Sequence, residues 1–167
     1  MLKKLLFYIL CFLIPPNLSN AFTNEQLQIL EYVNKHGGYY KKDIAAIIIQ
    51  ESFVGNKVKR TGDNNKAYGI GQMHLPTAKH ILTVNNKPYK KQEIKNKLLT
   101  DDEYAVKMVV KYYRYLMKKF KYDRKKAILA YNVGPTKLKR TGLKFDPNDY
   151  LNKVLSYRKL IVMKGIV

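Results

Sequence analysis

The chain has little of three things: cysteine, acidic side chains and long apolar runs. Cys11 is the only cysteine among 167 residues, so no disulfide can form within the chain. That excludes a small scaffold held together by disulfides. The longest apolar run, 5–14, is too short to span a bilayer as a helix. Because no repeat, linker or low-complexity tract divides the chain, its 46% hydrophobic content predicts one globular domain with a core of its own.

The first 21 residues have the form of a secretory signal peptide. Lys3 and Lys4 precede the apolar run, two prolines end it, and Ser19-Asn20-Ala21 has the small-x-small pattern of a cleavage site. We therefore expect residues 1–21 to be a signal peptide cleaved after Ala21, and 22–167 to form the mature domain. An uncleaved anchor is the alternative. Export without disulfides is typical of a bacterial envelope protein.

Acidic residues are scarce, and the balance of charge is strongly basic. Lys and Arg number 32 against 12 Asp and Glu, which gives a net charge of +20. The expected signal peptide removes two lysines, so the mature chain keeps +18. A field of this sign favours anionic partners. An AT-rich genome would produce the same abundance of Lys, Asn, Ile and Tyr without any selection for binding. No recognised nucleic-acid motif accompanies the charge, and we expect no nucleic-acid partner.

Start and stop signals predict a mainly α fold. Thr23 and Gln26 have the spacing of a capping box, and Gly37-Gly38 ends the helix that follows. Asp123 is the expected cap of a later helix. Further helices are expected over about 40–51, 76–84, 90–99, 100–120, 124–132 and from 149 to about 160, capped by Asn148 or Asp149. Residues 53–68 are expected to be irregular or to hold short strands, and 137–148 to be a basic loop.

One carboxylic acid ends an otherwise apolar helix face. At helical spacing, Ile44, Ile47, Ile48 and Glu51 share one face of the helix expected over 40–51. A carboxylate among isoleucines either reaches solvent at the helix end or lies in a partly dry cleft with a raised pKa. The second environment is the one that a general acid needs near neutral pH. On this stretch alone, the solvated residue is the simpler interpretation.

Two further motifs follow in order. Gly69-Ile70-Gly71-Gln72-Met73 places two glycines around an isoleucine, a pattern that allows close approach of the backbone to a neighbour. Ala130-Tyr131-Asn132-Val133-Gly134 ends a later helix. With Glu51-Ser52, with Pro76-Thr77-Ala78, and with a closing Tyr150-Leu151-x-Lys153-Val154-Leu155-x-x-Tyr157 helix, these motifs resemble the soluble lytic transglycosylase family of the lysozyme superfamily. The resemblance covers roughly residues 27–160 and implies a lysozyme-like single domain.

The resemblance implies cleavage of the β-1,4 bond between N-acetylmuramic acid and N-acetylglucosamine in peptidoglycan, with a 1,6-anhydromuramoyl product. Glu51 would act first as acid and then as base, without metal or cofactor. Tyr150 is the first choice for a tyrosine that supports the transition state, and Tyr157 is the second. Ser52 would orient Glu51, unless it is only a helix-terminal hydroxyl. The implied sugar-binding residues are Gly69, Gln72, Met73, Tyr131 and Asn132. Read without the resemblance, Met73 and Tyr131 belong in a core, and Asn132 is a capping residue.

The stretch from Glu51 to Gln72 is a little longer than is usual in the family, and His74 is a second departure. His74 occupies the position at which goose-type lysozymes, which are relatives, carry a second carboxylate, and its presence argues against hydrolysis. However, Gly62-Asp63 is similar to a Gly-Asp pair in those lysozymes, so Asp63 is the residue that would favour a hydrolysing muramidase. A turn residue is the plainer interpretation of Asp63. A non-catalytic cationic peptidoglycan-binding protein is the third possibility. His36, His74 and His80 are not spaced as metal ligands.

The expected partners are peptidoglycan glycan strands in the periplasm or cell envelope of a bacterium. An enzyme of this kind serves wall turnover or opens the wall locally for a secretion or conjugation machine, and the sequence holds no motif that chooses between these roles. No stable membrane span is expected after signal cleavage.

Overall fold

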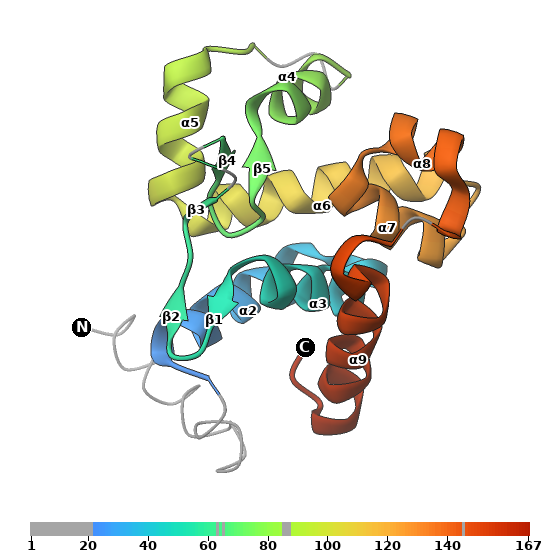
Figure 1. Ribbon diagram of the computed structural model, residues 1–167. Helices are drawn as coiled ribbons and strands as arrows, with labels where there is room; N and C mark the ends of the chain where they lie inside the picture. Colours follow the sequence, from blue (N-terminus) through green and yellow to red (C-terminus); the bar gives the residue numbers. More distant parts are fainter. Residues whose placement is uncertain (1–21, 63, 65, 85–87, 145) are drawn as a thin grey trace.

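The computed structural model describes residues 22–62, 64, 66–84, 88–144 and 146–167, and it confirms a mainly α fold. Figure 1 shows α6, the longest of the described helices, with α2 and α3 on one side and α4 and α5 on the other. The α-helices are α2 (Asn24–His36), α3 (Lys41–Ser52), α4 (Leu75–Val84), α5 (Lys91–Thr100), α6 (Asp102–Lys119), α7 (Arg124–Val133), α8 (Pro135–Thr141) and α9 (Tyr150–Lys164). Short 3₁₀ segments lie at Gly38–Tyr40, Gly142–Lys144 and Pro147–Asp149.

The segment between α3 and α4 forms two small antiparallel sheets. The sequence predicted either irregular structure or short strands here, and the structure has short strands. In the first, β1 (Phe53–Val54) pairs with β2 (Lys57–Val58). In the second, β4 (Ala67–Tyr68) lies between β3 (Thr61–Gly62) and β5 (Met73–His74). The register pairs Ala67 with His74 and Tyr68 with Met73. This segment therefore folds back across the end of α3.

Side-chain caps set several helix starts. Thr23 and Gln26 form the predicted capping box at the start of α2. The carboxylate of Asp101 accepts from the backbone N–H of Tyr104 at 2.8 Å, and that of Asp123 accepts from Lys126 at 3.0 Å. These caps satisfy backbone donors that the first turn of a helix leaves unpaired.

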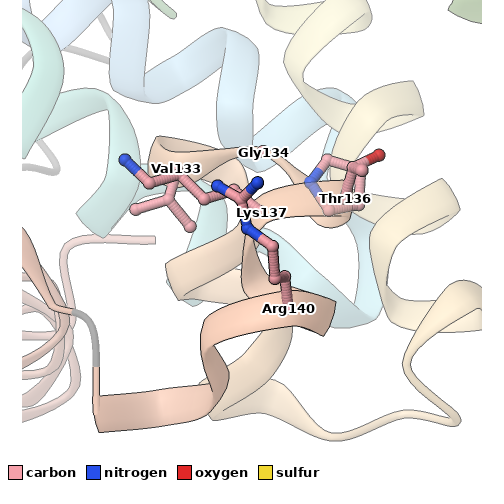
Figure 2. Close-up of a pocket in the computed structure, with 6 residues that line it drawn as sticks. Val133, Gly134, Thr136, Lys137 and Arg140 are labelled. Atoms are coloured by element: carbon pink, nitrogen blue, oxygen red, sulfur yellow. The ribbon is translucent and has the colours of Figure 1, made fainter.

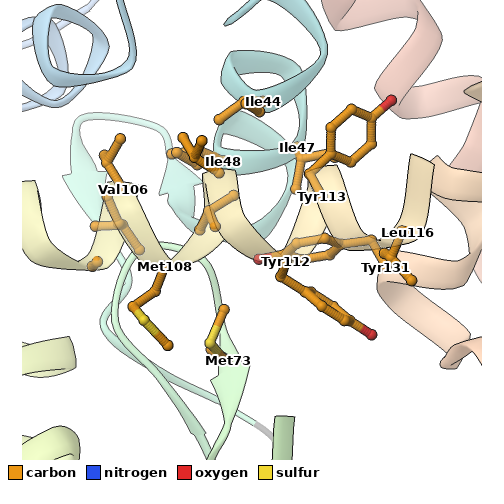
Figure 3. Close-up of a cluster of buried hydrophobic side chains, with 14 of the residues drawn as sticks. Ile44, Ile47, Ile48, Met73, Val106, Met108, Tyr112, Tyr113, Leu116 and Tyr131 are labelled. Atoms are coloured by element: carbon orange, nitrogen blue, oxygen red, sulfur yellow. The ribbon is translucent and has the colours of Figure 1, made fainter. Parts of the chain in front are cut away.

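The core lies around α3 and α6. Ile44, Ile47 and Ile48 are each 0% exposed, and the whole stretch 44–49 is buried, so α3 is apolar on more than the one face predicted. Figure 3 shows Ile47 beside Tyr113 of α6, within one cluster of buried side chains. Burying one side chain of this size contributes roughly 1.5–3 kcal/mol. A helix this deeply packed gives the residues at its carboxyl end fixed positions.

A buried acid ties three helices together. Asp43, at the start of α3, is 2% exposed. Its carboxylate accepts from Arg124 Nε of α7 at 3.2 Å and from Arg158 Nε of α9 at 2.5 Å. A buried carboxylate is tolerated when cations and hydrogen bonds compensate it. The pairing holds α7 and α9 against α3, and both helices contribute residues around Glu51.

One local prediction was wrong, and another was right only in part. Residues 137–148 are not a single basic loop, because Pro135–Thr141 form the helix α8 with Pro135 in its first turn. Leu138 is its one buried residue, so an otherwise polar and basic segment carried no apolar periodicity to reveal the helix. Asp149 stands at the N-cap of α9, as one of the two predicted caps, but its carboxylate accepts from the side-chain amide of Asn152 at 2.7 Å and not from a backbone N–H. The backbone N–H of Leu151 donates to Asp146 instead.

Within the part of the chain that the structure describes, no helix combines the length and apolar character needed to cross a membrane.

Candidate active site in the Glu51 pocket

Glu51 lies in the last turn of α3, partly buried, with its carboxyl group against Tyr150 of α9. The Tyr150 hydroxyl donates a hydrogen bond to Glu51 Oε1 at 2.7 Å. Burial raises the pKa of Glu51 from 4.5 to about 7, although the Tyr150 hydrogen bond and the positive charge of Lys59 both act to lower it. The group therefore exchanges a proton near neutral pH, which suits an acid that must later act as a base.

The carboxyl group faces a pocket of about 360 Å³. Residues far apart in the sequence form its lining, because α3, the strands and the end of α7 converge there. The lining consists of Glu51, Lys59, Ala67, Gln72, His74, Tyr131 and Asn132. Glu51 is the one acidic side chain among these described residues, and the remaining polar groups can hydrogen-bond a sugar-like ligand.

The glycines of the 69–73 motif allow two close approaches of the backbone. Gly69 has φ +69°, and a Cβ there would lie 2.1 Å from the carbonyl oxygen of Leu98 on α5. A Cβ on Gly71 would lie 2.3 Å from Val109 Cγ2 of α6. Any larger residue at either position would push this loop off α5 and α6. The predicted close approach is thus confirmed, and its neighbours are protein helices.

Two buried hydroxyl groups fasten the same loop. The Ser52 hydroxyl, 0% exposed, donates to the carbonyl of Ile70. The Tyr131 hydroxyl donates to the carbonyl of Gly71 at 2.7 Å. Gln72 follows with φ +44°, a left-handed conformation that a side chain seldom adopts, and its side-chain amide donates to the carbonyl of Gly69 at 3.0 Å. These bonds fix the loop beside Glu51.

The carboxyl end of α7 supplies Tyr131 and Asn132. Tyr131 is 9% exposed and its ring lies 5.2 Å from that of Tyr112, so it packs in the core and also borders the pocket. Burial raises its pKa well above 10, so the hydroxyl remains protonated as a donor. Asn132 is exposed and lines the pocket.

Comparison with known proteins identifies the family. The family profile described as Transglycosylase SLT domain matches residues 30–152, which is most of the chain. The chain belongs to the SLT domain family. The predicted resemblance to soluble lytic transglycosylases is thereby confirmed, and a comparison with curated proteins finds no match.

Solved structures share the fold of this SLT domain. An inactive mutant of lytic transglycosylase Slt from Pseudomonas aeruginosa matches with a TM-score of 0.65 and 23% identity over 83% of this chain and 24% of that one. The 70 kDa soluble lytic transglycosylase from Escherichia coli matches with a TM-score of 0.64 and 22% identity over the same shares. At these identities the likeness concerns the fold, and the chain spans about a quarter of the length of either protein.

Three of the residues singled out in the sequence lie away from the pocket of this SLT domain. Met73 is 3% exposed and lies among the core side chains in Figure 3. Gly69 packs against Leu98. The Ser52 hydroxyl donates to the carbonyl of Ile70, so Ser52 is linked to Glu51 by the peptide bond and not by a side-chain hydrogen bond. None of these three residues lines the Glu51 pocket.

The geometry also distinguishes the two tyrosines of α9. Tyr150, 4% exposed, is the one that hydrogen-bonds Glu51. Tyr157 lies two turns further along the helix, about 10 Å away at 1.5 Å per residue, and is partly exposed. Tyr150 is therefore the tyrosine that can act on the carboxyl group. Asp63, whose role was left open, lies outside the described residues.

Lys59 is one of the pocket residues that sequence reasoning missed, together with Ala67 and His74. Lys59 lies between β2 and β3, and its backbone N–H donates to the carbonyl of Ser52 at 2.7 Å, which holds it next to the end of α3. Nothing marks one loop lysine among 32 basic residues, so no sequence signal could have found it.

Two more hollows border the site. One, of about 570 Å³, shares His74 with the Glu51 pocket. The other begins at Val133, directly after Asn132, and Figure 2 shows its residues at the turn from α7 to α8, including Lys137 and Arg140. The Glu51 pocket therefore shares one lining residue, His74, with the larger hollow and ends one residue before the other in the sequence. Among the described residues, no group of three or more His, Cys, Asp or Glu side chains could hold a metal ion.

Proposed function

We propose that this SLT domain is a lytic transglycosylase that cleaves the β-1,4 bond between N-acetylmuramic acid and N-acetylglucosamine in peptidoglycan. The observation that carries the proposal is the state of Glu51: a partly buried carboxyl group with a pKa of about 7, bonded by Tyr150 and opening into a polar pocket. Membership of the SLT domain family supports the same reaction.

In the first step, protonated Glu51 donates its proton to the glycosidic oxygen. The bond from that oxygen to C1 of the muramoyl sugar breaks, and N-acetylglucosamine leaves with a free 4-hydroxyl. Positive charge develops at C1, and the N-acetyl group of the substrate helps to carry it. Because Tyr150 already donates to Oε1, the proton of Glu51 belongs on Oε2, the oxygen left to face the substrate.

In the second step, Glu51 acts as the base. Its carboxylate takes the proton from the C6 hydroxyl of the same muramoyl sugar, and the C6 oxygen bonds to C1 to close the 1,6-anhydro ring. Glu51 is thereby returned to its acid form. One carboxyl group suffices for both steps when its pKa lies near the working pH. Hydrolysis in the usual two-carboxylate scheme employs a second carboxylate that activates water or acts as the nucleophile.

The protein would work in the bacterial envelope, on peptidoglycan strands, after export directed by residues 1–21. The positive charge of the domain suits an anionic wall polymer. A role in wall turnover and a role beside a secretion or conjugation machine are both compatible with this chemistry.

The test is a charge-neutral change at Glu51. Glu51→Gln keeps the shape and the Tyr150 hydrogen bond but has no proton to give. We expect it to lower the rate at which purified sacculi are cleared by at least about 10²-fold, the lower end of the effect of general acid–base catalysis. Glu31→Gln, an exposed acid on α2, is the matched control and should clear sacculi at the wild-type rate.

Full activity of Glu51→Gln would contradict the proposal. If the wild-type protein bound sacculi without cleaving them, the non-catalytic cationic binding protein would be the correct interpretation instead.

A further inference from the structure

The larger hollow beside the Glu51 pocket is basic and aromatic. Eight described side chains line its 570 Å³, and none of them is acidic. Its cations are Lys66, Lys79 and Lys91, and its aromatic rings are Tyr68 and Tyr89. Strand β4 supplies a residue to each pocket, Ala67 to one and Tyr68 to the other, and His74 lines both. We call this hollow the lysine pocket.

One cation of the lysine pocket, and one cation beside it, lie over aromatic rings that line the pocket. Lys79 Nζ lies 6.0 Å from the centroid of the Tyr89 ring. Lys95 Nζ, from the adjoining helix α5, lies 5.1 Å from the centroid of the Tyr68 ring. A ring face attracts an ammonium group without neutralising it. Glu93, an acid on the same helix α5, is already bonded to Lys97 at 2.8 Å. The pocket therefore presents positive charge to an incoming ligand.

A neutral sugar does not account for this composition. Hydroxyl and acetamide groups of a glycan are recognised by hydrogen-bonding side chains, as in the Glu51 pocket, whereas three ammonium groups around one hollow match carboxylates or phosphates. On the proposed substrate, the muramoyl sugar carries a peptide with free carboxylate groups. That peptide branches from the sugar whose bond Glu51 would cleave, so it must leave the Glu51 pocket through a neighbouring recess.

We propose that the lysine pocket binds the carboxylates of the peptide stem on the strand being cleaved, and so makes this enzyme selective for peptide-bearing strands over bare glycan. The proposal rests on the proposed function, because it assigns the occupant from the same substrate. Tyr68 and Tyr89 would pack against the apolar parts of the peptide, and the lysines would hold its carboxylates.

The experiment compares strands that carry peptide stems with strands from which an amidase has removed them. The variant is Lys79→Gln/Lys91→Gln, and the matched control is Lys118→Gln/Lys125→Gln, two exposed lysines on α6 and α7 that do not line the pocket. We expect the wild-type protein and the control to prefer peptide-bearing strands about fivefold to tenfold in kcat/KM, as expected for two partly exposed charge contacts. The pocket variant should process both substrates equally, at the rate that the wild-type protein shows on bare strands.

Binding measured without turnover separates this proposal from the proposed function. In Glu51→Gln protein, the Kd of a soluble muramyl-peptide fragment should rise about fivefold to tenfold when Lys79 and Lys91 are also replaced, while the Kd of the peptide-free disaccharide should not change. The rise should shrink in high salt, which screens exposed charges.

Equal affinity of the variant and its parent for the peptide-bearing fragment would overturn the proposal. So would displacement of that fragment by poly(glycerol phosphate) but not by the free stem peptide, because a phosphate polymer would then be the occupant. If the wild-type protein cleaved neither substrate, the proposed function would fail, and the Kd values would still decide what the lysine pocket binds.

Discussion

At the scale of the residue, opposing effects set the protonation of Glu51. Burial at the end of an apolar helix disfavours the carboxylate, while the Tyr150 hydroxyl and the charge of Lys59 favour it. The result is a pKa of about 7, so both protonation states are populated at neutral pH. The balance depends on two side chains that can be replaced singly.

Replacing Tyr150 by Phe should alter both the rate and its pH dependence. Loss of the hydrogen bond removes an effect that lowers the pKa of Glu51, so that pKa should rise above 7. The alkaline limb of kcat/KM, where the acid form of Glu51 is lost, should move to higher pH. The maximum rate should fall about 10- to 100-fold, as for loss of a hydrogen bond to a charged group.

Tyr157→Phe is the control for this prediction, since Tyr157 lies two turns away on the same helix α9. It should retain a limb near pH 7. An unchanged rate and an unchanged limb in Tyr150→Phe would show that Tyr150 does not act on Glu51.

Glu51 should also destabilise the fold at neutral pH. Its pKa is raised from 4.5 to about 7 on folding, so stability present below pH 4.5 is lost as pH rises through 7. A shift of this size corresponds to about 3 kcal/mol. Glu51→Gln should therefore gain up to about 3 kcal/mol in free energy of unfolding over the wild-type protein between pH 4.5 and pH 8, measured by urea denaturation. A difference that does not vary with pH would refute this.

At the scale of the element, the site depends on a loop fixed between helices. The loop 69–72 is held by hydroxyl groups from α3 and α7, and its two glycines lie against α5 and α6. Four helices therefore determine where Gln72 stands relative to Glu51. An error in any of these contacts would change the pocket without touching the carboxyl group.

Gly69→Ala should separate backbone strain from steric overlap. Gly69 and Gly55 both have positive φ, +69° and +55°, but a Cβ at Gly55 would meet nothing within 4 Å. Gly55→Ala should cost about 1 kcal/mol of stability from strain alone. Gly69→Ala should cost at least about 2 kcal/mol, because its Cβ would also collide with the backbone of Leu98. Equal losses in thermal or urea unfolding would refute the close approach.

Local signals explain which elements could be predicted. The capping box at Thr23 and the caps at Asp101 and Asp123 act within three residues, so the sequence displays them directly. Helix α8 has no such side-chain cap and only one buried residue, Leu138, so neither capping nor periodicity revealed it. The basic residues of this segment led to the prediction of a loop, although a run of basic residues is equally compatible with an exposed helix.

The candidate site could be predicted only in part, because some of its contacts are not local in the sequence. Glu51 and Tyr150 belong to motifs whose order along the chain resembles that of the family. In the structure the Tyr150 hydroxyl lies 2.7 Å from Glu51 Oε1. The bond from Ser52 to Ile70, the burial of Met73 and the position of Lys59 depend on how β1–β5 fold over α3. Contacts across such short strands leave no periodic pattern in the sequence.

At the scale of the whole molecule, the excess of positive charge agrees with the proposed substrate. A domain with many more cations than acids is suited to a wall polymer that carries carboxylates. The lysine pocket concentrates that charge next to the Glu51 pocket. The general excess of lysine and the local cluster are separable, because the control lysines on α6 and α7 carry the same charge elsewhere.

The export prediction can be checked on the protein itself. If residues 1–21 are a signal peptide, protein recovered from the periplasm of an expressing bacterium should begin at Phe22. N-terminal sequencing or intact mass spectrometry measures this. A chain that retains Met1 and fractionates with membranes would support the uncleaved anchor instead. A change of Ala21 to a bulky residue should block cleavage, while the same change at Thr23 should not.

The central claim is that Glu51 alone converts a glycosidic bond into a 1,6-anhydro ring, and the most direct measurement is the mass of the sugar ends released from purified sacculi. A transglycosylase product ends in 1,6-anhydromuramic acid, which is lighter by one water than the reducing end left by hydrolysis. We predict anhydro ends from the wild-type protein and no released fragments from Glu51→Gln. Reducing ends from the wild-type protein would contradict the account and identify a muramidase.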